Sequence, residues 1–260
     1  MNMNKVAGRP LRWREKPSPY CPGCGHGVVH RLVCELLEEF NLADQCVFMA
    51  PVGCSIMAYT FLDLDVCQSA HGRTPAVATG IKRALPDTFV LAYQGDGDLA
   101  SIGMAEIIHA ANRGETITTI FVNNAIYGMT GGQMAPTTLS GQKATTCPEG
   151  RDPSAGMGYP IRVCELLQSL DGVAYLARTT VHTPANVVKT KSALKKAFES
   201  QLNKTGFSLV EVLASCPVSW GMQPIEALDF VEKQMVPQYP LGEYKVAGQI
   251  VLPKAREGAG

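Results

Sequence analysis

Two polar clusters, each placed directly after a buried strand, constrain this chain more than any other feature. Residues 89–94 read as a buried strand that leads into a Gly-Asp-Gly-Asp sequence at 95–98, and residues 117–122 read as a second strand that leads into an Asn-Asn pair at 123–124. Between them, residues 102–112 carry apolar side chains at helical spacing, which predicts a strand–helix–strand unit. Strands connected in this way are parallel. Both clusters therefore fall at carboxyl ends of strands, where open α/β sheets bind ligands.

The residue types in these clusters fit a magnesium ion bound to a diphosphate. Mg2+ prefers six oxygen ligands and takes few of them from protein. Asp96 offers a carboxylate, Asn124 an amide oxygen and Ile126 a backbone carbonyl. Gly95 and Gly97 allow the backbone to approach phosphate closely. The alternative is a glycine turn and an unrelated asparagine pair in a surface loop, but the strand context and the spacing together favour the diphosphate interpretation.

Composition restricts the class of protein. The chain has 260 residues, of which 46% are hydrophobic and 18% charged, and its formal net charge is zero. These values are typical of a globular domain and give no indication of nucleic-acid or membrane binding. The first 20 residues contain no apolar segment of the kind found in signal peptides, so we expect a cytoplasmic protein. Nine cysteines in such a chain favour thiols and metal ligation over disulfides.

The pattern predicts an α/β fold with a mostly parallel sheet and helices on both faces. We expect an N-terminal arm at 1–20, one α/β domain at 21–220, and a C-terminal extension at 221–260 that contacts other subunits. Residues 128–160 are rich in Gly, Thr and Pro and predict a long functional loop. The remaining expected elements are helices at 27–40, 75–84, 161–170 and 184–203, and strands at 46–50, 173–179 and 207–213.

The cysteines indicate a metal site without fixing the metal. Cys21-Pro-Gly-Cys24 is compatible with structural zinc, an iron–sulfur cluster or a redox pair. A redox pair would follow a strand and open its own strand–helix–strand unit, which this arm does not. Cys54 and Cys216 each follow a strand and could complete four ligands, and zinc and iron–sulfur both stay open at this point. Cys147 lies in the long loop and could be a ligand or a buried thiol. The others read as core thiols: Cys34, Cys46, Cys67 and Cys164.

Taken in order, these motifs strongly resemble the beta subunit of the 2-oxoacid:ferredoxin oxidoreductases. The resemblance runs from Cys21 to Cys216. It is carried by Cys21-Pro-Gly-Cys24-Gly-His, Val52-Gly-Cys54-Ser, His71-Gly-Arg73, Gly95-Asp-Gly-Asp98, Asn123-Asn-Ala-Ile-Tyr-Gly-Met-Thr-Gly-Gly-Gln133 and Pro136-Thr-Thr138.

The resemblance implies a thiamine diphosphate-binding fold that carries thiamine diphosphate, Mg2+ and a [4Fe–4S] cluster. The implied magnesium ligands are Asp96, Asn124 and Ile126. The implied cluster ligands are Cys21, Cys24, Cys54 and Cys216. The residues expected to act on the substrate are His71, Thr130 and Gln133. The implied contacts to thiamine diphosphate are Val52, Gly53, Cys54, Ser55, His71, Gly72, Gly95, Asp96, Gly97, Asp98, Asn124, Ile126, Gly128 and Met129.

The same resemblance implies oxidative decarboxylation of a 2-oxo acid to acyl-coenzyme A and CO2, with electrons passing to ferredoxin. The glutamate that activates thiamine would come from the pyrimidine-binding domain of an alpha subunit, so we expect this chain to be inactive alone. A small ferredoxin-like subunit is a further expected partner. Met57 is apolar where some relatives carry a basic residue, which favours a branched-chain substrate such as 2-oxoisovalerate over 2-oxoglutarate. Two alternatives are the diphosphate-binding subunit of a non-oxidative thiamine-dependent decarboxylase and a zinc-stabilised assembly subunit.

Overall fold

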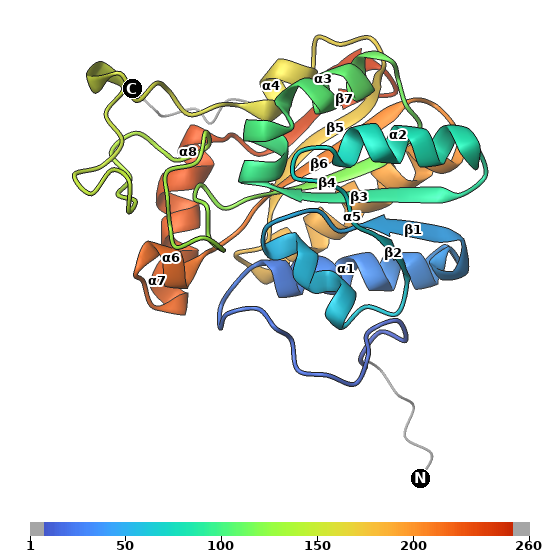
Figure 1. Ribbon diagram of the computed structural model, residues 1–260, viewed down its shortest axis with the longest axis horizontal. Coiled ribbons are helices and arrows are strands. Elements are labelled where there is room, and N and C mark those ends of the chain that lie inside the picture. The colour runs from blue at the N-terminus through green and yellow to red at the C-terminus, as the bar shows by residue number, and fades with distance from the viewer. Residues whose placement is uncertain (1–7, 252–260) are drawn as a thin grey trace.

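An eight-stranded sheet forms the centre of the protein in the computed structural model, which describes residues 8–251 (Figure 1). Its order is β2-β1-β3-β4-β6-β5-β7-β8, and the six strands from β2 to β5 in this order are parallel. β7 and β8 are added antiparallel at the edge beside β5. The strands are β1 Cys46–Met49, β2 Asp65–Cys67, β3 Phe89–Gly95, β4 Thr118–Asn123, β5 Val173–Thr180, β6 Phe207–Leu213, β7 Gly242–Val246 and β8 Gln249–Ile250.

Helices cover both faces of the sheet, as a parallel sheet requires. On one face, α1 His26–Glu39 and α5 Pro184–Leu202 enclose one hydrophobic core with the strands. On the other face, α2 Thr74–Ala84, α3 Met104–Asn112 and α4 Val163–Leu167 enclose a second. α1 forms because Val29, Leu32, Val33, Leu36 and Leu37 repeat at helical spacing, and all five are buried against the sheet.

The structure confirms the predicted fold class, a mostly parallel α/β sheet with helices on both faces. Three details differ from expectation. The segment after Gly53 is a 3-10 helix, η2 Cys54–Thr60, and β2 follows it at the sheet edge. The helix expected at 102 begins earlier as a π-helical turn, η3 Asp98–Ile102. These short elements carry no sequence period of their own, so tertiary contacts determine them.

Much of the C-terminal extension packs on the α/β domain. Residues 224–246 form α7 Pro224–Phe230, η5 Val231–Met235, α8 Val236–Gln238 and β7. Tyr239 and Tyr244 are buried, which anchors this segment to the sheet. Subunit contacts by this region stay a prediction. The ends of the expected arm and extension, residues 1–7 and 252–260, lie outside the described residues.

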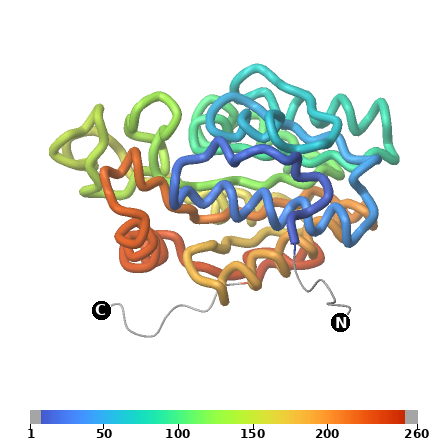
Figure 2. Tube along the Cα trace, turned by 90° about the horizontal axis from the view of Figure 1, so that it is seen from below, coloured from blue at the N-terminus to red at the C-terminus, as the bar shows by residue number. Residues whose placement is uncertain are grey.

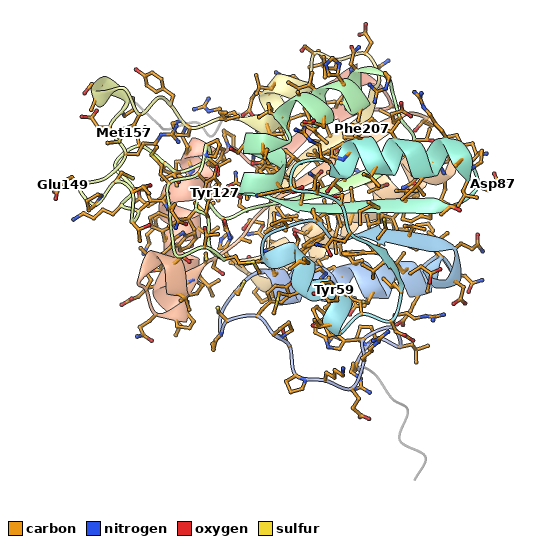
Figure 3. All side chains as sticks on the ribbon, in the orientation of Figure 1. Tyr59, Asp87, Tyr127, Glu149, Met157 and Phe207 are labelled. Atoms are coloured by element: carbon orange, nitrogen blue, oxygen red, sulfur yellow. The ribbon has the colours of Figure 1, made fainter. Side chains whose placement is uncertain are left out.

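One end of the sheet carries the long loop and the C-terminal helices. Figure 2 shows the loop at 128–160 (yellow-green) and the orange-red helices gathered at the same end of the molecule. Figure 3 places Tyr127 where this loop leaves the sheet and Glu149 and Met157 at its far edge, with Asp87 at the opposite end of the molecule. α6 Pro217–Trp220 lies in the same region. Within residues 8–251, no helix has the length and apolarity needed to cross a bilayer.

Candidate functional site

A cavity of about 320 Å3, called the main cavity here, opens at the carboxyl ends of the strands. Most of the residues expected to contact a cofactor or substrate line it: Val52, Gly53, Cys54, Ser55, His71, Gly95, Asp96, Gly97, Asp98, Asn124, Ile126, Gly128, Met129 and Thr130. Four residues that the sequence did not single out also line it: His26, Ser101, Ile102 and Tyr127. Two expected residues lie off this lining. Gly72 is buried behind it, and the side-chain amide of Gln133 donates to the backbone oxygen of Thr130 at 2.8 Å.

Asp96 is fixed at the floor of the main cavity by backbone amides. Its two carboxylate oxygens accept from the N–H groups of Asn124 at 3.2 Å and Ile126 at 3.1 Å, and the Thr137 hydroxyl donates to it as well. Burial is the main cause that raises the pKa of Asp96, to about 7. A buried carboxylate with donors but no cation beside it is an environment that a divalent ion would stabilise.

Two further oxygens beside Asp96 are free for a metal. The side-chain amide of Asn124 lines the main cavity and has no hydrogen-bond partner in the described part of the chain, and neither does the backbone carbonyl of Ile126. A carboxylate, an amide oxygen and a carbonyl are hard ligands that suit Mg2+. The donor set that the sequence predicted is thus present around one cavity.

The Asp98 carboxylate is hydrogen-bonded to His71 and its neighbours and is therefore not available to a ligand in the main cavity. It accepts from His71 Nδ1 at 2.7 Å, from the Gly72 N–H at 2.7 Å and from Gln94 Nε2 at 2.6 Å. Gly72 fits here because a Cβ atom would meet the Gly103 nitrogen at 2.8 Å. The carboxylate fixes the His71 ring, so contact between Asp98 and a diphosphate would fall to its backbone.

The four cysteines expected to hold a cluster surround a second cavity of about 230 Å3, called the cysteine cavity here. Cys21, Cys24, Cys54 and Cys216 all line it. Burial first, and the charges of the neighbouring thiolates second, raise the pKa of Cys24 to about 12 and of Cys54 to about 11. A cationic metal centre would favour the thiolate forms that burial disfavours. Cys147 is buried in an apolar cluster with Ile126 and Cys216 and does not line this cavity.

The main cavity and the cysteine cavity share a wall. The residues that line both cavities, called the shared wall here, are His26, Cys54, Asn124, Gly128 and Met129. The wall therefore contains one expected cluster ligand and one expected magnesium ligand. A group bound in the main cavity would lie next to a group bound by the cysteines.

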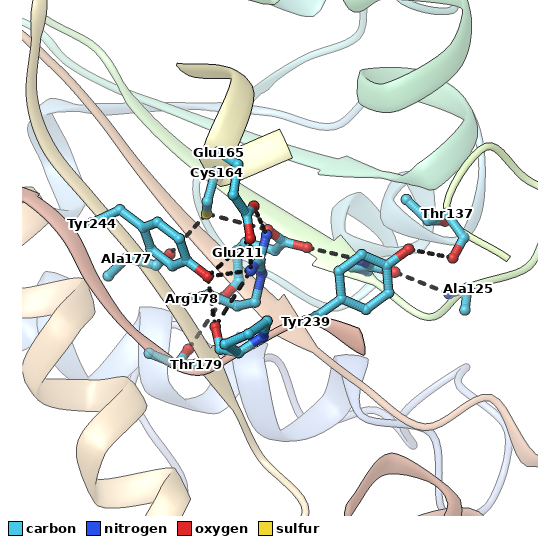
Figure 4. A network of polar contacts seen from close by, with 12 residues as sticks. Ala125, Thr137, Cys164, Glu165, Ala177, Arg178, Thr179, Glu211, Tyr239 and Tyr244 are labelled. Carbon is cyan, nitrogen blue, oxygen red and sulfur yellow. Dashed lines mark hydrogen bonds and ion pairs between the residues drawn. The ribbon is translucent and has the colours of Figure 1, made fainter. Parts of the chain in front are cut away.

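A buried ionic network that the sequence did not reveal is centred on Arg178 and Glu211 (Figure 4). Asn123 donates to Glu211 at 2.7 Å and accepts from the Ala125 N–H at 3.1 Å. Ala125 has a φ of +55°, and this contact helps to hold the strained turn that presents Asn124. Arg178 Nε donates to Glu211 at 2.8 Å, and both side chains are fully buried.

The guanidinium of Arg178 is enclosed on its other sides. It also pairs with Glu165 at 2.6 Å and lies 4.9 Å from the centre of the Tyr244 ring. Figure 4 shows these groups converging around Arg178, with Tyr239 extending from them toward Thr137. The Tyr239 hydroxyl donates to the Thr137 backbone oxygen, and Thr137 in turn donates to Asp96. The network thus reaches the turn at 124–126 through Asn123, and the Asp96 carboxylate through Thr137.

Arg151 is a further residue whose role the sequence did not reveal. It is 5% exposed and donates to six backbone carbonyls of the long loop, at distances from 2.7 to 3.3 Å. Burial lowers its pKa. A single guanidinium therefore organises the loop that contains Thr137. The only signal in the sequence is an arginine within a loop rich in Gly, Thr and Pro.

Met57 does not line the main cavity, although the expectation of a branched-chain substrate placed it beside the substrate. It lines the cysteine cavity and is absent from the lining of the main cavity. The 3-10 helix η2, which begins at Cys54, carries Met57 to that side. The apolar residues of the main cavity that stand half exposed at its surface are Ile102 and Met129.

Comparison with known proteins gives a family match over most of the chain. Residues 51–212 match the family described as thiamine pyrophosphate enzyme, C-terminal TPP binding domain. The 2-oxoglutarate synthase subunit KorB of Methanocaldococcus jannaschii is 34% identical over 251 residues, covering 93% of this chain and 88% of that protein. The solved 2-oxoglutarate:ferredoxin oxidoreductase from Magnetococcus marinus, with 2-oxoglutarate, coenzyme A and succinyl-CoA bound, superposes with a TM-score of 0.74 at 30% identity. The match covers 87% of this chain and 73% of the chain in that structure.

A higher identity is found with a differently named relative. The ketoisovalerate oxidoreductase subunit VorA of Methanothermobacter thermautotrophicus is 46% identical over 226 residues. This match covers 87% of this chain but 47% of that protein, so the chain spans about half the length of the relative.

The buried network makes a stability prediction. Arg178→Met should lower the free energy of unfolding by about 3–5 kcal/mol, because it leaves the Glu211 charge buried without a cation. The double variant Arg178→Met/Glu211→Leu should regain most of this loss. Lys204→Met, which breaks an exposed ion pair with Asp87, should change stability by less than about 1 kcal/mol. Urea unfolding followed by circular dichroism measures all three, and equal effects of the two single variants would contradict the prediction.

Proposed function

The chain belongs to the thiamine pyrophosphate enzymes, among the subunits of 2-oxoacid oxidoreductases, and we propose that it is the beta subunit of a cytoplasmic 2-oxoacid:ferredoxin oxidoreductase. The proposed complex converts a 2-oxo acid, coenzyme A and two oxidised ferredoxins into an acyl-coenzyme A, CO2, two reduced ferredoxins and a proton. Electrons balance because the two released on decarboxylation and thioester formation pass singly to two ferredoxins.

The shared wall is the observation that carries this proposal. Cys54 and Asn124 belong to it, so a one-electron centre held by the cysteines would lie beside a cofactor in the main cavity. A non-oxidative decarboxylase has no use for such a centre. The juxtaposition therefore favours the oxidative reaction over the non-oxidative alternative.

The main cavity fits thiamine diphosphate and Mg2+. Asp96, Asn124 and the Ile126 carbonyl would hold the metal, because one is a buried carboxylate without a cation and the other two are oxygen donors without partners. Gly95 and Gly97 line the cavity beside them and leave room for phosphate oxygens. Bound there, thiamine supplies the electron sink for decarboxylation. His71, oriented by Asp98, would present its other ring nitrogen to the bound molecules.

The cysteine cavity fits a cluster better than a single ion. Within residues 8–251, no three His, Cys, Asp or Glu side chains converge on one point as a zinc site requires. Four cysteines instead surround a volume of about 230 Å3. A [4Fe–4S] cluster needs this arrangement, because it is a body with four irons that are each held by a thiolate. We therefore propose Cys21, Cys24, Cys54 and Cys216 as its ligands.

The lining of the main cavity supports a requirement for an alpha subunit. No glutamate is among the described residues that line it, and its carboxylates, Asp96 and Asp98, are both engaged as described above. The glutamate that activates thiamine would therefore come from the pyrimidine-binding domain of the partner. Ile102 and Met129 are 50% and 47% exposed at the cavity, and the partner would cover them. A small ferredoxin-like subunit could relay electrons to ferredoxin.

A branched-chain 2-oxo acid such as 2-oxoisovalerate is the substrate we propose, in preference to 2-oxoglutarate. No Lys or Arg lines the described main cavity to bind a second carboxylate. Ile102 and Met129 offer apolar surface instead, worth about 0.8 kcal/mol for each methylene that a substrate buries. The relative named for ketoisovalerate is 46% identical, against 34% for one named for 2-oxoglutarate.

Removal of the metal ligands should abolish cofactor binding. In the co-purified complex, Asp96→Ala should weaken thiamine diphosphate binding in Mg2+ by at least about 100-fold, and Asn124→Ala nearly as much, because the diphosphate loses its neutralising ion. Asn123→Ala should cause an intermediate loss of about 10-fold, because Asn123 holds the turn through its contacts to Glu211 and Ala125. Isothermal titration calorimetry measures these affinities, and wild-type affinity in the Asp96 variant would refute the assignment.

Iron content tests the cluster. Each serine variant of Cys21, Cys24, Cys54 and Cys216 should lose iron and the visible iron–sulfur absorption after anaerobic purification, since serine replaces thiolate poorly. Cys34→Ser and Cys147→Ser are matched controls, because both thiols are buried but lie off the cysteine cavity. Zinc in place of iron in the wild-type protein would favour the zinc-stabilised alternative. Full iron in Cys216→Ser would remove that residue from the ligand set.

Substrate preference is measured on the whole complex with coenzyme A and a viologen acceptor. The ratio of kcat/KM for 2-oxoisovalerate to that for 2-oxoglutarate should exceed one. Ile102→Lys should move this ratio toward the dicarboxylate by placing a cation at the main cavity, whereas Met57→Lys should leave the ratio unchanged because Met57 lines the other cavity. A wild-type preference for 2-oxoglutarate would overturn the substrate proposal alone.

A further inference from the structure

His26 occupies the shared wall without a role in the proposed cofactor sites. It is the first residue of α1, is 3% exposed and lines both cavities. One ring nitrogen, Nδ1, lies 2.7 Å from the Tyr93 hydroxyl, and the ring stacks on Tyr20 with centroids 4.9 Å apart. The imidazole is therefore fixed in orientation.

The partner of Nδ1 determines which ring nitrogen carries the proton. The Tyr93 hydroxyl is fully buried, and Nδ1 of His26 is its one hydrogen-bond partner in the described part of the chain. If Nδ1 carried a proton, the phenolic proton would be buried without an acceptor, which is unfavourable. Tyr93 thus donates to Nδ1, and Nε2 carries the ring proton. A ring that accepts at Nδ1 and carries its proton on Nε2 is the neutral imidazole.

The Nε2–H group faces open space. It has no hydrogen-bond partner among residues 8–251. Five side-chain atoms in this part of the chain lack a partner and are fully enclosed, and Nε2 of His26 is not one of them, so it is accessible. The open space next to His26 is that of the two cavities. Tyr20, which covers one face of the ring, lines the cysteine cavity and not the main cavity. The backbone N–H of His26 already bonds to the Cys24 sulfur and lowers its pKa against the effect of burial.

We infer that His26 donates a hydrogen bond from Nε2 to a sulfur atom of the cluster held in the cysteine cavity and thereby raises the reduction potential of that cluster. The inference rests on the proposed function, since it requires the cluster. Reduction adds one electron to the cluster, breaks no bond and increases the negative charge on sulfur. A neutral donor stabilises this charge, and hydrogen bonds to sulfur are among the factors that set cluster potentials. Tyr93 acts as a positioning residue because it selects the tautomer that donates.

The test is a mediated redox titration of the anaerobically purified complex, reduced with dithionite and followed by electron paramagnetic resonance. His26→Phe keeps a ring but removes the donor. It should shift the ratio of reduced to oxidised cluster about tenfold toward the oxidised form at a fixed potential, a fall of about 59 mV for one electron. His26→Gln retains a donor and should restore most of the shift. Tyr93→Phe leaves the tautomer free and should fall between His26→Phe and wild type.

Separate measurements distinguish the possible failures. Iron content and thiamine diphosphate affinity are determined for each variant beside the potential. An unchanged potential in His26→Phe at full iron content overturns the inference and leaves the proposed function standing. If His26→Phe loses iron, an unchanged potential in Tyr93→Phe at full iron content overturns it instead. A weakened thiamine diphosphate affinity with no change in potential also overturns it, by assigning the donor to the main cavity. Wild-type complex without iron overturns both proposals.

Discussion

The geometry of the site depends on two contacts of the Glu211 carboxylate, a hydrogen bond from Asn123 and an ion pair with Arg178. Glu211 lies in β6, between β4 and β5, and is completely enclosed. Its two oxygens accept from Asn123 on one neighbouring strand and Arg178 on the other. A charge in this position would be strongly unfavourable without both partners, so the three strands are held in one register at their carboxyl ends. The two hydrophobic layers stabilise the sheet, whereas this polar contact fixes the positions from which the loops after β4, β5 and β6 begin.

The contact matters because the turn at 124–126, which contains two of the proposed metal ligands, has no regular structure to hold it. Ala125 takes a left-handed conformation, and the amides of Asn124 and Ile126 point at Asp96. Asn123 fixes one side of this turn from the ionic network. Thr138, in the loop organised by Arg151, fixes the other through the Ala125 carbonyl at 2.7 Å. An unfavourable backbone conformation persists only where its surroundings determine it in this way. Apolar residues at these positions could fill the same space, but they would offer no acceptor to Asn123 and so would not hold the turn.

The sequence predicted the layers of the fold and the residues around the main cavity because strand-end placement needs only local patterns. Asp96 and Asn124 each follow an apolar run, and parallel strands bring such positions to one edge. The Arg178–Glu211 pair could not be found in this way, because it depends on β6 lying between β4 and β5, and strand order is not a local property. Met57 was misplaced since its spacing from Cys54 does not reveal that η2 turns it to the cysteine cavity. The packing of residues 224–246 was missed because short helices of mixed composition show little periodicity.

The shared wall is thin at Gly128, because this residue has no side chain to separate the two cavities. A Cβ atom at this position would lie 3.1 Å from the Cys216 sulfur and 3.8 Å from the Asn124 amide nitrogen. Even one methyl group would press a proposed cluster ligand, so glycine keeps the two cavities in contact. The residues that form the wall include no Lys, Arg, Asp or Glu. A further charge there would favour one oxidation state of a centre in the cysteine cavity over the other. Hydrogen bonds, such as the one proposed for His26, would then adjust the potential of a cluster bound in that cavity.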